Sequence, residues 1–276
     1  MRSLELPLQA ADGHRWTLLA RIPAAPTAAL LWLPALGVGA KHYLPLAQAL
    51  ATHGIAAFVH EWRGNGSSRL RADHGHDWGY RELLMLDLPA SEAAIDHALS
   101  GITRIIGGHS LGGQLACCRL ALAPQTAQAL WLVASGAPWW RAFPTPTRWW
   151  LPLAYRFLPW LADRRGALPG RRIGFGGQEA RGVIRDWART ALSGRYAATG
   201  VDIDLERALR RVDVPVRAVA FTGDWLAPLS SLQFLLSKLG TATVDVALLD
   251  DAALGIRANH FAWLQQPGAV AVALRR

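Results

Sequence analysis

The chain has 276 residues, a length that suits one large α/β domain with room for an insertion. Hydrophobic residues make up 51% of the chain and charged residues 18%, which excludes a disordered protein. No apolar run reaches the ~18 residues that a membrane-spanning helix needs. Residues 1–7 also lack the continuous apolar segment of a signal peptide, so we expect a cytoplasmic location.

The formal net charge of +9 is unevenly distributed. Residues 141–211 contain fourteen arginines, no lysine and six acidic residues, so about eight of the nine charges lie there. Residues 137–208 contain six of the thirteen tryptophans. A basic, Trp-rich segment of this kind could make weak contact with an anionic membrane surface or bind an anionic, apolar substrate. Alternatively, its arginines form ion pairs with nearby acidic residues on a solvent-exposed face. Because the charge is not spread over a basic face, we expect no nucleic-acid partner.

In chain order, the first half predicts strands that alternate with helices. The opening is a predicted hairpin around the Asp12-Gly13 turn. The predicted strands are residues 4–8, 15–22, 28–33, 55–60, 102–106 and 129–134. Helical spacing of apolar residues occurs at residues 41–53, 81–99 and 111–123. This alternation is typical of βαβ units in a mostly parallel sheet.

The alternation stops at Gly136. Residues 137–208 contain proline-punctuated aromatic patches and short helical pieces but no convincing strand, so we predict a helical lid there. The lid would be inserted into one α/β core made of residues 1–136 and 209–276. The remaining predicted elements are a strand at 214–221, a helix at 228–240, a strand at 243–249 and a short last helix.

Gly108-His109-Ser110-Leu111-Gly112 is the strongest chemical signal. It fits G-x-S-x-G, the nucleophile elbow that joins a strand to a helix. A serine at the tip of so sharp a turn has a strained backbone, and the neighbouring chain approaches too closely for side chains at the two glycines. The helix that follows directs its free N–H groups toward a developing oxyanion. We therefore predict Ser110 as a nucleophile.

A serine nucleophile needs a base, and the base needs a third group that orients it. Asp224 follows the strand at 214–221, at the sheet edge where α/β proteins build their sites. Asp250 and Asp251 are its rivals. His260 is the only histidine after Asp224 in the sequence. Ser110, Asp224 and His260 thus occur in the chain order that this architecture requires.

The oxyanion needs two backbone N–H donors. We expect them at Leu111, directly after the nucleophile, and at Leu36 in the loop after the strand at 28–33. Pro34 in that loop has no N–H to offer. The candidate pocket residues are His109, for which core packing is the alternative, and Trp139, Trp140 and Trp225.

Two other groups of residues have simpler interpretations. Asp73-His74-Gly75-His76-Asp77 hints at a metal site but lacks the H-x-H-x-D-H order of metallohydrolases, so we expect no metal. Cys117 and Cys118 are adjacent on one predicted helix and point in different directions. We expect two buried thiols rather than a disulfide.

Together these segments resemble the α/β-hydrolase superfamily over nearly the whole chain. The resemblance rests on Leu33-Pro34-Ala35-Leu36-Gly37, residues 60–68, the elbow, Gly223-Asp224 and Asn259-His260-Phe261, with Pro34-Ala35 standing where His-Gly is common. Within the superfamily, the chain is similar to bacterial predicted hydrolases near the serine aminopeptidase and monoacylglycerol lipase-like branch, on residues 77–79, 86–90, 169–174 and 186–189. The resemblance implies a serine hydrolase that needs no cofactor.

We therefore expect hydrolysis of a small-molecule carboxylic ester through an acyl-enzyme, as in carboxylesterases and lipases. A Trp-rich lid favours a hydrophobic acyl or alcohol group, because aromatic walls favour apolar ligands. The alternatives are a thioester or amide substrate, acyl transfer to an alcohol, and a non-catalytic binding protein with the same fold.

Overall fold

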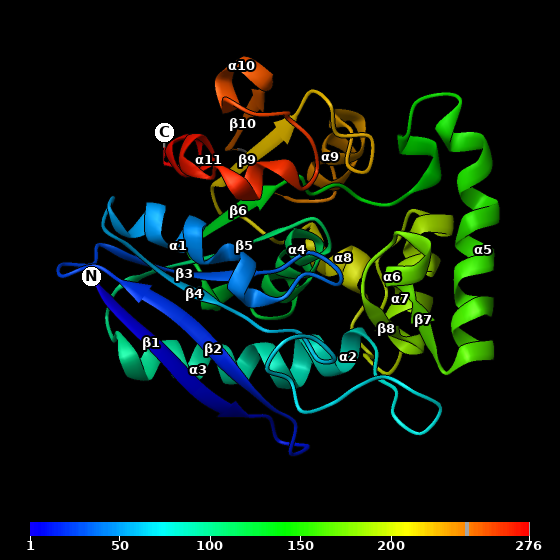
Figure 1. The fold of residues 1–276 in the computed structure, drawn as a ribbon, viewed down its shortest axis with the longest axis horizontal. Helices are drawn as coiled ribbons and strands as arrows, with labels where there is room; N and C mark the ends of the chain where they lie inside the picture. Colours follow the sequence, from blue (N-terminus) through cyan, green and yellow to red (C-terminus); the bar gives the residue numbers. More distant parts are fainter. Residues whose placement is uncertain (241–242, 276) are drawn as a thin grey trace.

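An eight-stranded sheet forms the centre of the computed structural model, which describes residues 1–240 and 243–275 (Figure 1). The strand order is β1-β2-β4-β3-β5-β6-β9-β10. The strands are Arg2–Gln9 (β1), Arg15–Ile22 (β2), Ala28–Leu33 (β3), Ile55–Val59 (β4), Thr103–His109 (β5), Ala129–Val133 (β6), Val216–Phe221 (β9) and Val244–Leu249 (β10). Within this sheet, the described β1–β2 and β2–β4 pairs are antiparallel and the other pairs are parallel, which confirms the predicted hairpin and the mostly parallel sheet.

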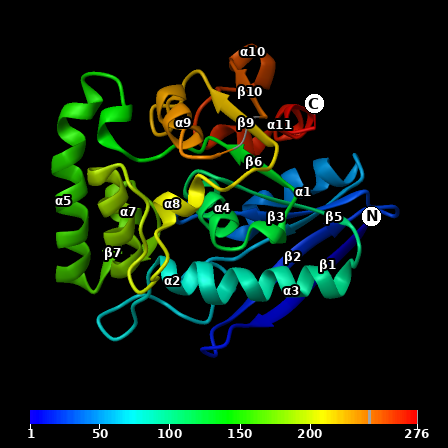
Figure 2. The ribbon, with the colours of Figure 1, turned by 180° about the vertical axis from the view of Figure 1, so that it is seen from behind.

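Helices cover both faces of the sheet, so its central strands are buried on both sides (Figures 1 and 2). Strand β3, for example, is buried along its whole length, as expected for a parallel strand between two helical layers. One apolar cluster contains side chains of α3 (Leu88–Ala98), α4 (Leu111–Leu122) and α9 (Leu229–Leu236). The other contains side chains of α1 (Leu44–Ala51), α10 (Asp251–Leu254) and α11 (Gly268–Ala273).

The helix predicted at residues 81–99 has three parts. It begins as α2 (Tyr80–Glu82), widens into a π-helical turn at Leu83–Asp87, and continues as α3. Pro89, which follows this turn, has no N–H to donate, and such wide turns often accompany a broken hydrogen-bond ladder. Asp87 in the π turn is buried and accepts two hydrogen bonds from Arg63, at 2.7 and 2.8 Å.

The segment between β6 and β9 stands beside one end of the sheet (Figure 1). Its elements are α5 (Thr147–Arg165), β7 (Ala167–Pro169), α6 (Gly170–Ile173), β8 (Gln178–Ala180), α7 (Arg181–Ser193) and α8 (Leu205–Leu209). The expectation that residues 137–208 contain no strand is wrong, because β7 and β8 pair in a second, antiparallel sheet. Each strand has three residues, too few to produce a visible alternation.

Continuous apolar packing joins this segment to the sheet. Tyr155 of α5 and Trp187 of α7 belong to the same buried cluster as Leu111 of α4 and Leu132 of β6.

Cys117 and Cys118 are both buried and free, which confirms the prediction of two thiols. In the described ranges, no helix combines the length and hydrophobicity needed to cross a membrane.

Candidate active site

Ser110 occupies the sharp turn between β5 and α4. Its backbone angles, φ 55° and ψ −119°, lie in a region that residues other than glycine rarely adopt. A Cβ atom at Gly108 would lie 2.5 Å from the carbonyl carbon of Gly112 and 2.7 Å from the carbonyl oxygen of Leu33. One at Gly112 would overlap the same oxygen. Glycine at both positions therefore allows the backbones of β3, β5 and α4 to meet around the serine.

Asp224 and His260 form a buried pair near this turn. Nδ1 of His260 lies 2.8 Å from Oδ2 of Asp224. Oδ1 of Asp224 accepts hydrogen bonds from the N–H groups of Leu226 and Ala227, at 2.9 and 3.0 Å. The carboxylate is thus held by the backbone and in turn orients the imidazole, which leaves Nε2 of His260 as the nitrogen available for proton transfer.

The rival carboxylates are engaged elsewhere. Oδ1 of Asp250 accepts a hydrogen bond from the N–H of Ala253 at the start of α10, at 2.8 Å. Oδ1 of Asp251 accepts one from the N–H of Ala258, at 2.7 Å. Asp224 is therefore the one of the three that contacts His260.

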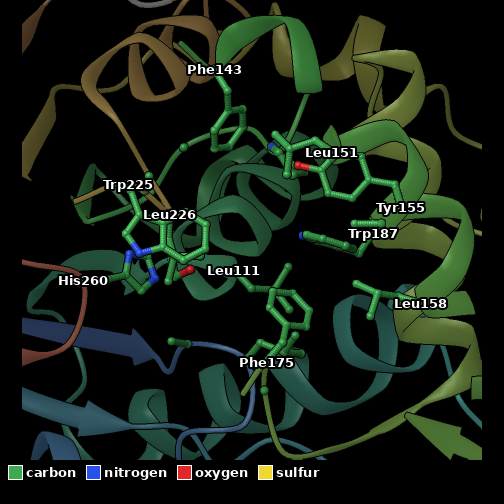
Figure 3. A pocket seen from close by; sticks show the side chains of 18 of the residues that line it. Leu111, Phe143, Leu151, Tyr155, Leu158, Phe175, Trp187, Trp225, Leu226 and His260 are labelled. Atoms are coloured by element: carbon green, nitrogen blue, oxygen red, sulfur yellow. The ribbon is translucent and has the colours of Figure 1, made fainter. Parts of the chain in front are cut away.

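Ser110 and His260 line one cavity of about 160 Å³, between the sheet and the segment that follows β6. Figure 3 shows Tyr155, Leu158 and Trp187 on the side opposite His260 and Trp225. The remaining lining is almost entirely apolar and includes Ala35, Leu36, Leu111, Pro138, Phe143, Trp150, Leu151, Ala154, Phe175, Leu226 and Phe261, with Gln114 as a polar exception. Among the described residues that line it, none is Asp, Glu, Lys or Arg.

Leu36 and Leu111 both line this cavity. In the part of the chain that the structure describes, neither backbone N–H has a hydrogen-bond acceptor. Leu111 is the first residue of α4, where N–H groups lack partners within the helix. Two free N–H groups beside Ser110 are what an oxyanion site requires.

Tyr43 ties the loop of Leu36 to the elbow. Its hydroxyl accepts a hydrogen bond from the N–H of Ala35 at 2.9 Å and lies 2.9 Å from Nδ1 of His109. Since the hydroxyl oxygen already accepts from Ala35, its proton is available to His109. Trp62 holds the same loop, donating from Nε1 to the carbonyl of Pro34 at 2.8 Å. The loop and the residue before Ser110 are therefore connected by buried hydrogen bonds.

Three of the four predicted pocket residues lie outside the cavity. His109 is fully buried, and its ring contacts that of His260 in a tilted arrangement and that of Trp263 in a T-shaped one, at centroid distances of 4.9 and 5.2 Å. Burial, together with the nearby His260, lowers the pKa of His109 well below its usual value, so it is neutral. Trp139 stacks on Phe234 at 4.4 Å, and Trp140 borders a surface groove.

Trp225 is the predicted pocket residue that lines the cavity. Leu151, Tyr155 and Leu158, which were not among the predicted pocket residues, present one face of α5 to the cavity. Their spacing of four and three residues is the signal that could have identified them.

The Asp73–Asp77 segment forms a local turn. Oδ1 of Asp73 accepts hydrogen bonds from the N–H groups of Gly75 and His76, both at 2.8 Å, and lies 3.0 Å from Nδ1 of His76. Among the described residues, no group of three or more His, Cys, Asp or Glu side chains could hold a metal ion.

Glu179 lies behind the cavity wall. Its Oε1 accepts a hydrogen bond from the N–H of Gly177 at 2.6 Å, and Gly177 packs against Gly37, the neighbour of Leu36. Glu179 is buried, and within the described residues it has no ion-pair partner. Burial raises the pKa of Glu179 to about 7, despite the opposing effect of the hydrogen bond from Gly177.

Comparison with known proteins gives a consistent picture. The model of the family described as serine aminopeptidase, S33, matches residues 24–189. Similar solved structures include an esterase from Exiguobacterium antarcticum (TM-score 0.70, 15% identity, 98% of each chain covered). An esterase domain from a Rhodothermus marinus protein has a TM-score of 0.63 at 15% identity, covering 98% of this chain and 95% of that one. A hydrolase from Pseudomonas aeruginosa PA01 has a TM-score of 0.58 at 20% identity, covering 96% of each chain.

At these identities the solved structures establish the α/β-hydrolase fold and nothing finer. No curated protein matches the chain.

The role of Tyr43 is open to a direct test. We expect Tyr43→Phe to lower kcat for p-nitrophenyl butyrate about tenfold with little change in KM, because the loop of Leu36 loses a tether that matters for the charged transition state. Tyr80→Phe is the matched control, since the buried Tyr80 hydroxyl has no hydrogen-bond partner in the described structure. Equal kcat values for the two variants would contradict this role.

Glu179 should make stability depend on pH. Its pKa in the folded chain, about 7, is raised above the ordinary value of 4.5, so its contribution to stability is complete below about pH 4.5 and is lost as the pH rises through 7. Glu179→Gln keeps a side-chain acceptor for Gly177 but cannot ionise. We expect the variant to match the wild type in Tm at pH 5 and to exceed it by several degrees at pH 8 in thermal unfolding. A Tm difference independent of pH would refute the assignment.

Proposed function

We propose that this chain, which belongs to the serine aminopeptidase S33 family of α/β hydrolases, is a serine hydrolase that cleaves carboxylic esters with an apolar acyl group. The observation that carries the proposal is the convergence on one cavity of Ser110, of His260 oriented by Asp224, and of two free backbone N–H groups. These are the parts that acyl transfer requires: a nucleophile, an oriented base and an oxyanion site.

In the proposed reaction, Oγ of Ser110 attacks the ester carbonyl while Nε2 of His260 takes its proton. The resulting oxyanion accepts hydrogen bonds from the N–H groups of Leu36 and Leu111. When the tetrahedral intermediate collapses, the C–O bond to the alcohol breaks and His260 donates its proton to the leaving oxygen. Water then attacks the acyl-enzyme while Nε2 of His260 takes a proton from it. The second tetrahedral intermediate collapses, the bond between Oγ of Ser110 and the acyl carbon breaks, His260 returns the proton to Oγ, and the carboxylic acid is released. Asp224 stays ionised and stabilises the imidazolium at each step.

The cavity supports an uncharged, apolar acyl group. Its volume of about 160 Å³ is close to the 150 Å³ of an engineered apolar cavity that binds benzene, so it suits a group of roughly six carbons. The walls opposite His260 come from Tyr155, Leu158 and Trp187 (Figure 3), and their aromatic and aliphatic surfaces favour such a group.

The cavity does not suit the free amino terminus that the name of the family suggests. A substrate ammonium group buried beside Ser110 would need a carboxylate to offset its loss of hydration. Among the described residues that line the cavity, no side chain is acidic. We therefore favour esters over amino-terminal peptides within the same family.

Ser110→Ala tests the proposal. We expect the wild type to react with a fluorophosphonate probe and to hydrolyse p-nitrophenyl esters, and the variant to lose labelling and at least about 10³-fold in kcat. Ser231→Ala is the control, because this buried hydroxyl lies outside the cavity lining and has no partner in the described structure. Labelling without ester turnover would point to a thioester, an amide or acyl transfer. No labelling of the folded protein would favour a binding protein.

Leu158 should help to set the acyl length. Leu158→Ala enlarges the cavity, so we expect the best p-nitrophenyl ester in a C2–C16 series to shift by about two carbons or more toward longer chains. Leu161→Ala is the matched control, because Leu161 lies on the same helix but borders an outer groove. A shift of equal size in both variants would argue against this binding mode.

A further inference from the structure

The outer face of α5 exposes a row of large apolar side chains. Trp149, Leu153, Phe157 and Trp160 are 64%, 70%, 51% and 51% exposed. Their spacing of four, four and three residues puts them on one side of the helix, away from the side that lines the cavity. Isolated exposed apolar residues are normal, but a contiguous row of this kind marks an interaction surface.

Arginines accompany this row. The guanidinium groups of Arg148 and Arg164 lie 4.8 and 5.2 Å from the ring centres of Trp149 and Trp160. Arg156 lies on the same helix and is exposed. None of the three arginines forms an ion pair with a described residue.

Local pairing accounts for the arginines of α7 but not for those of α5. Arg185 and Arg189 of α7 contact Asp163 and Asp186 at 2.6 and 3.2 Å. Asp163 is the only acidic residue in the sequence of α5, and it is engaged by Arg185. The outer face of α5 therefore combines aromatic side chains with positive charges that are not neutralised locally.

A basic groove lies at the C-terminal end of α5. It has a volume of about 620 Å³ and is lined by Arg165, Arg171, Arg172 and Ile173, among others. Within the described residues, none of these three arginines forms an ion pair, and Ile173 is 43% exposed. The groove thus repeats the combination of exposed apolar surface and unpaired arginine.

The mouth of the cavity lies next to the same helix. Trp150, beside Trp149, lines the cavity and is 46% exposed. Trp225, across from it at a ring-centre distance of 6.5 Å, also lines the cavity and is 60% exposed. Whatever covers the outer face of α5 therefore lies close to the entrance.

We propose that α5 and the basic groove dock this protein on an anionic lipid bilayer. Tryptophan, phenylalanine and leucine side chains would enter the interfacial region while the flanking arginines contact lipid phosphates, the arrangement typical of interfacial helices. The charge favours this occupant over a second copy of the chain, since two such faces would bring unpaired arginines together. The proposal does not depend on the identity of the nucleophile.

Co-sedimentation with phosphatidylglycerol and phosphatidylcholine vesicles tests the docking surface. We expect the wild type to bind phosphatidylglycerol vesicles and to release them as the salt concentration rises. Leu153→Ser/Phe157→Ser and Arg156→Gln/Arg164→Gln should each weaken that binding about tenfold or more. The matched controls, Val246→Ser/Leu248→Ser on the exposed side of β10 and Arg2→Gln/Arg275→Gln, should bind as the wild type does.

The outcomes separate docking from catalysis. Hydrolysis of soluble p-nitrophenyl butyrate should persist in every variant of this set, because none of the substituted residues lines the cavity. Hydrolysis without vesicle binding would overturn the docking proposal and leave the proposed function intact. The docking proposal would also be overturned if the α5 and β10 variants lost vesicle binding equally, or if the wild type bound both lipids equally well. A wild-type dimer that dissociates on the substitution Leu153→Ser/Phe157→Ser would overturn it too, because the row would then bind a second copy of the chain. Vesicle binding that Ser110→Ala retains would support docking even if turnover is absent.

Discussion

The close contact of three backbones around Ser110 is the constraint on which the rest of the site depends. Gly108, Gly112 and the carbonyl of Leu33 leave no room for a Cβ atom between β5, α4 and β3. This contact holds Ser110 at a positive φ and brings the start of α4 next to the loop that follows β3. Leu36 and Leu111 line the same cavity because these elements cannot separate without loss of packing.

The loop of Leu36 is held both by residues that precede β6 and by residues between β6 and β9. From the core side, Tyr43 and Trp62 bond to its backbone. From the other side, the Gly177 backbone packs against Gly37, with the buried Glu179 behind it. The segment between β6 and β9 is therefore part of the proposed site, and its packing is coupled to the position of Leu36. The pKa of the Glu179 carboxyl is raised to about 7, so the group that accepts the hydrogen bond of Gly177 behind this loop changes its charge near neutral pH.

Helix α5 has two apolar faces with different partners. One face lines the cavity through Leu151, Tyr155 and Leu158. The other is exposed and carries Leu153 and Phe157. A helix that is apolar on both sides has a weak amphipathic signal, so periodicity alone does not reveal which side faces the core. Of the tryptophans predicted for the pocket, Trp225 lines the cavity, whereas Trp139 and Trp140 precede α5 and lie outside it; Trp150 and Trp187 take their place in the lining.

The alternating core, the elbow at Ser110, and the order in which Asp224 and His260 follow it can be read from the residues alone. These features depend on apolar spacing, on glycine in a turn and on residue order, and all three are visible along the linear chain. The burial of His109, the hydrogen bonds through which Tyr43 connects the loop of Leu36 to the elbow, and the place of Glu179 behind the cavity wall emerge only once the chain is folded. These contacts join residues far apart in the chain, and they depend on side-chain directions that packing alone sets.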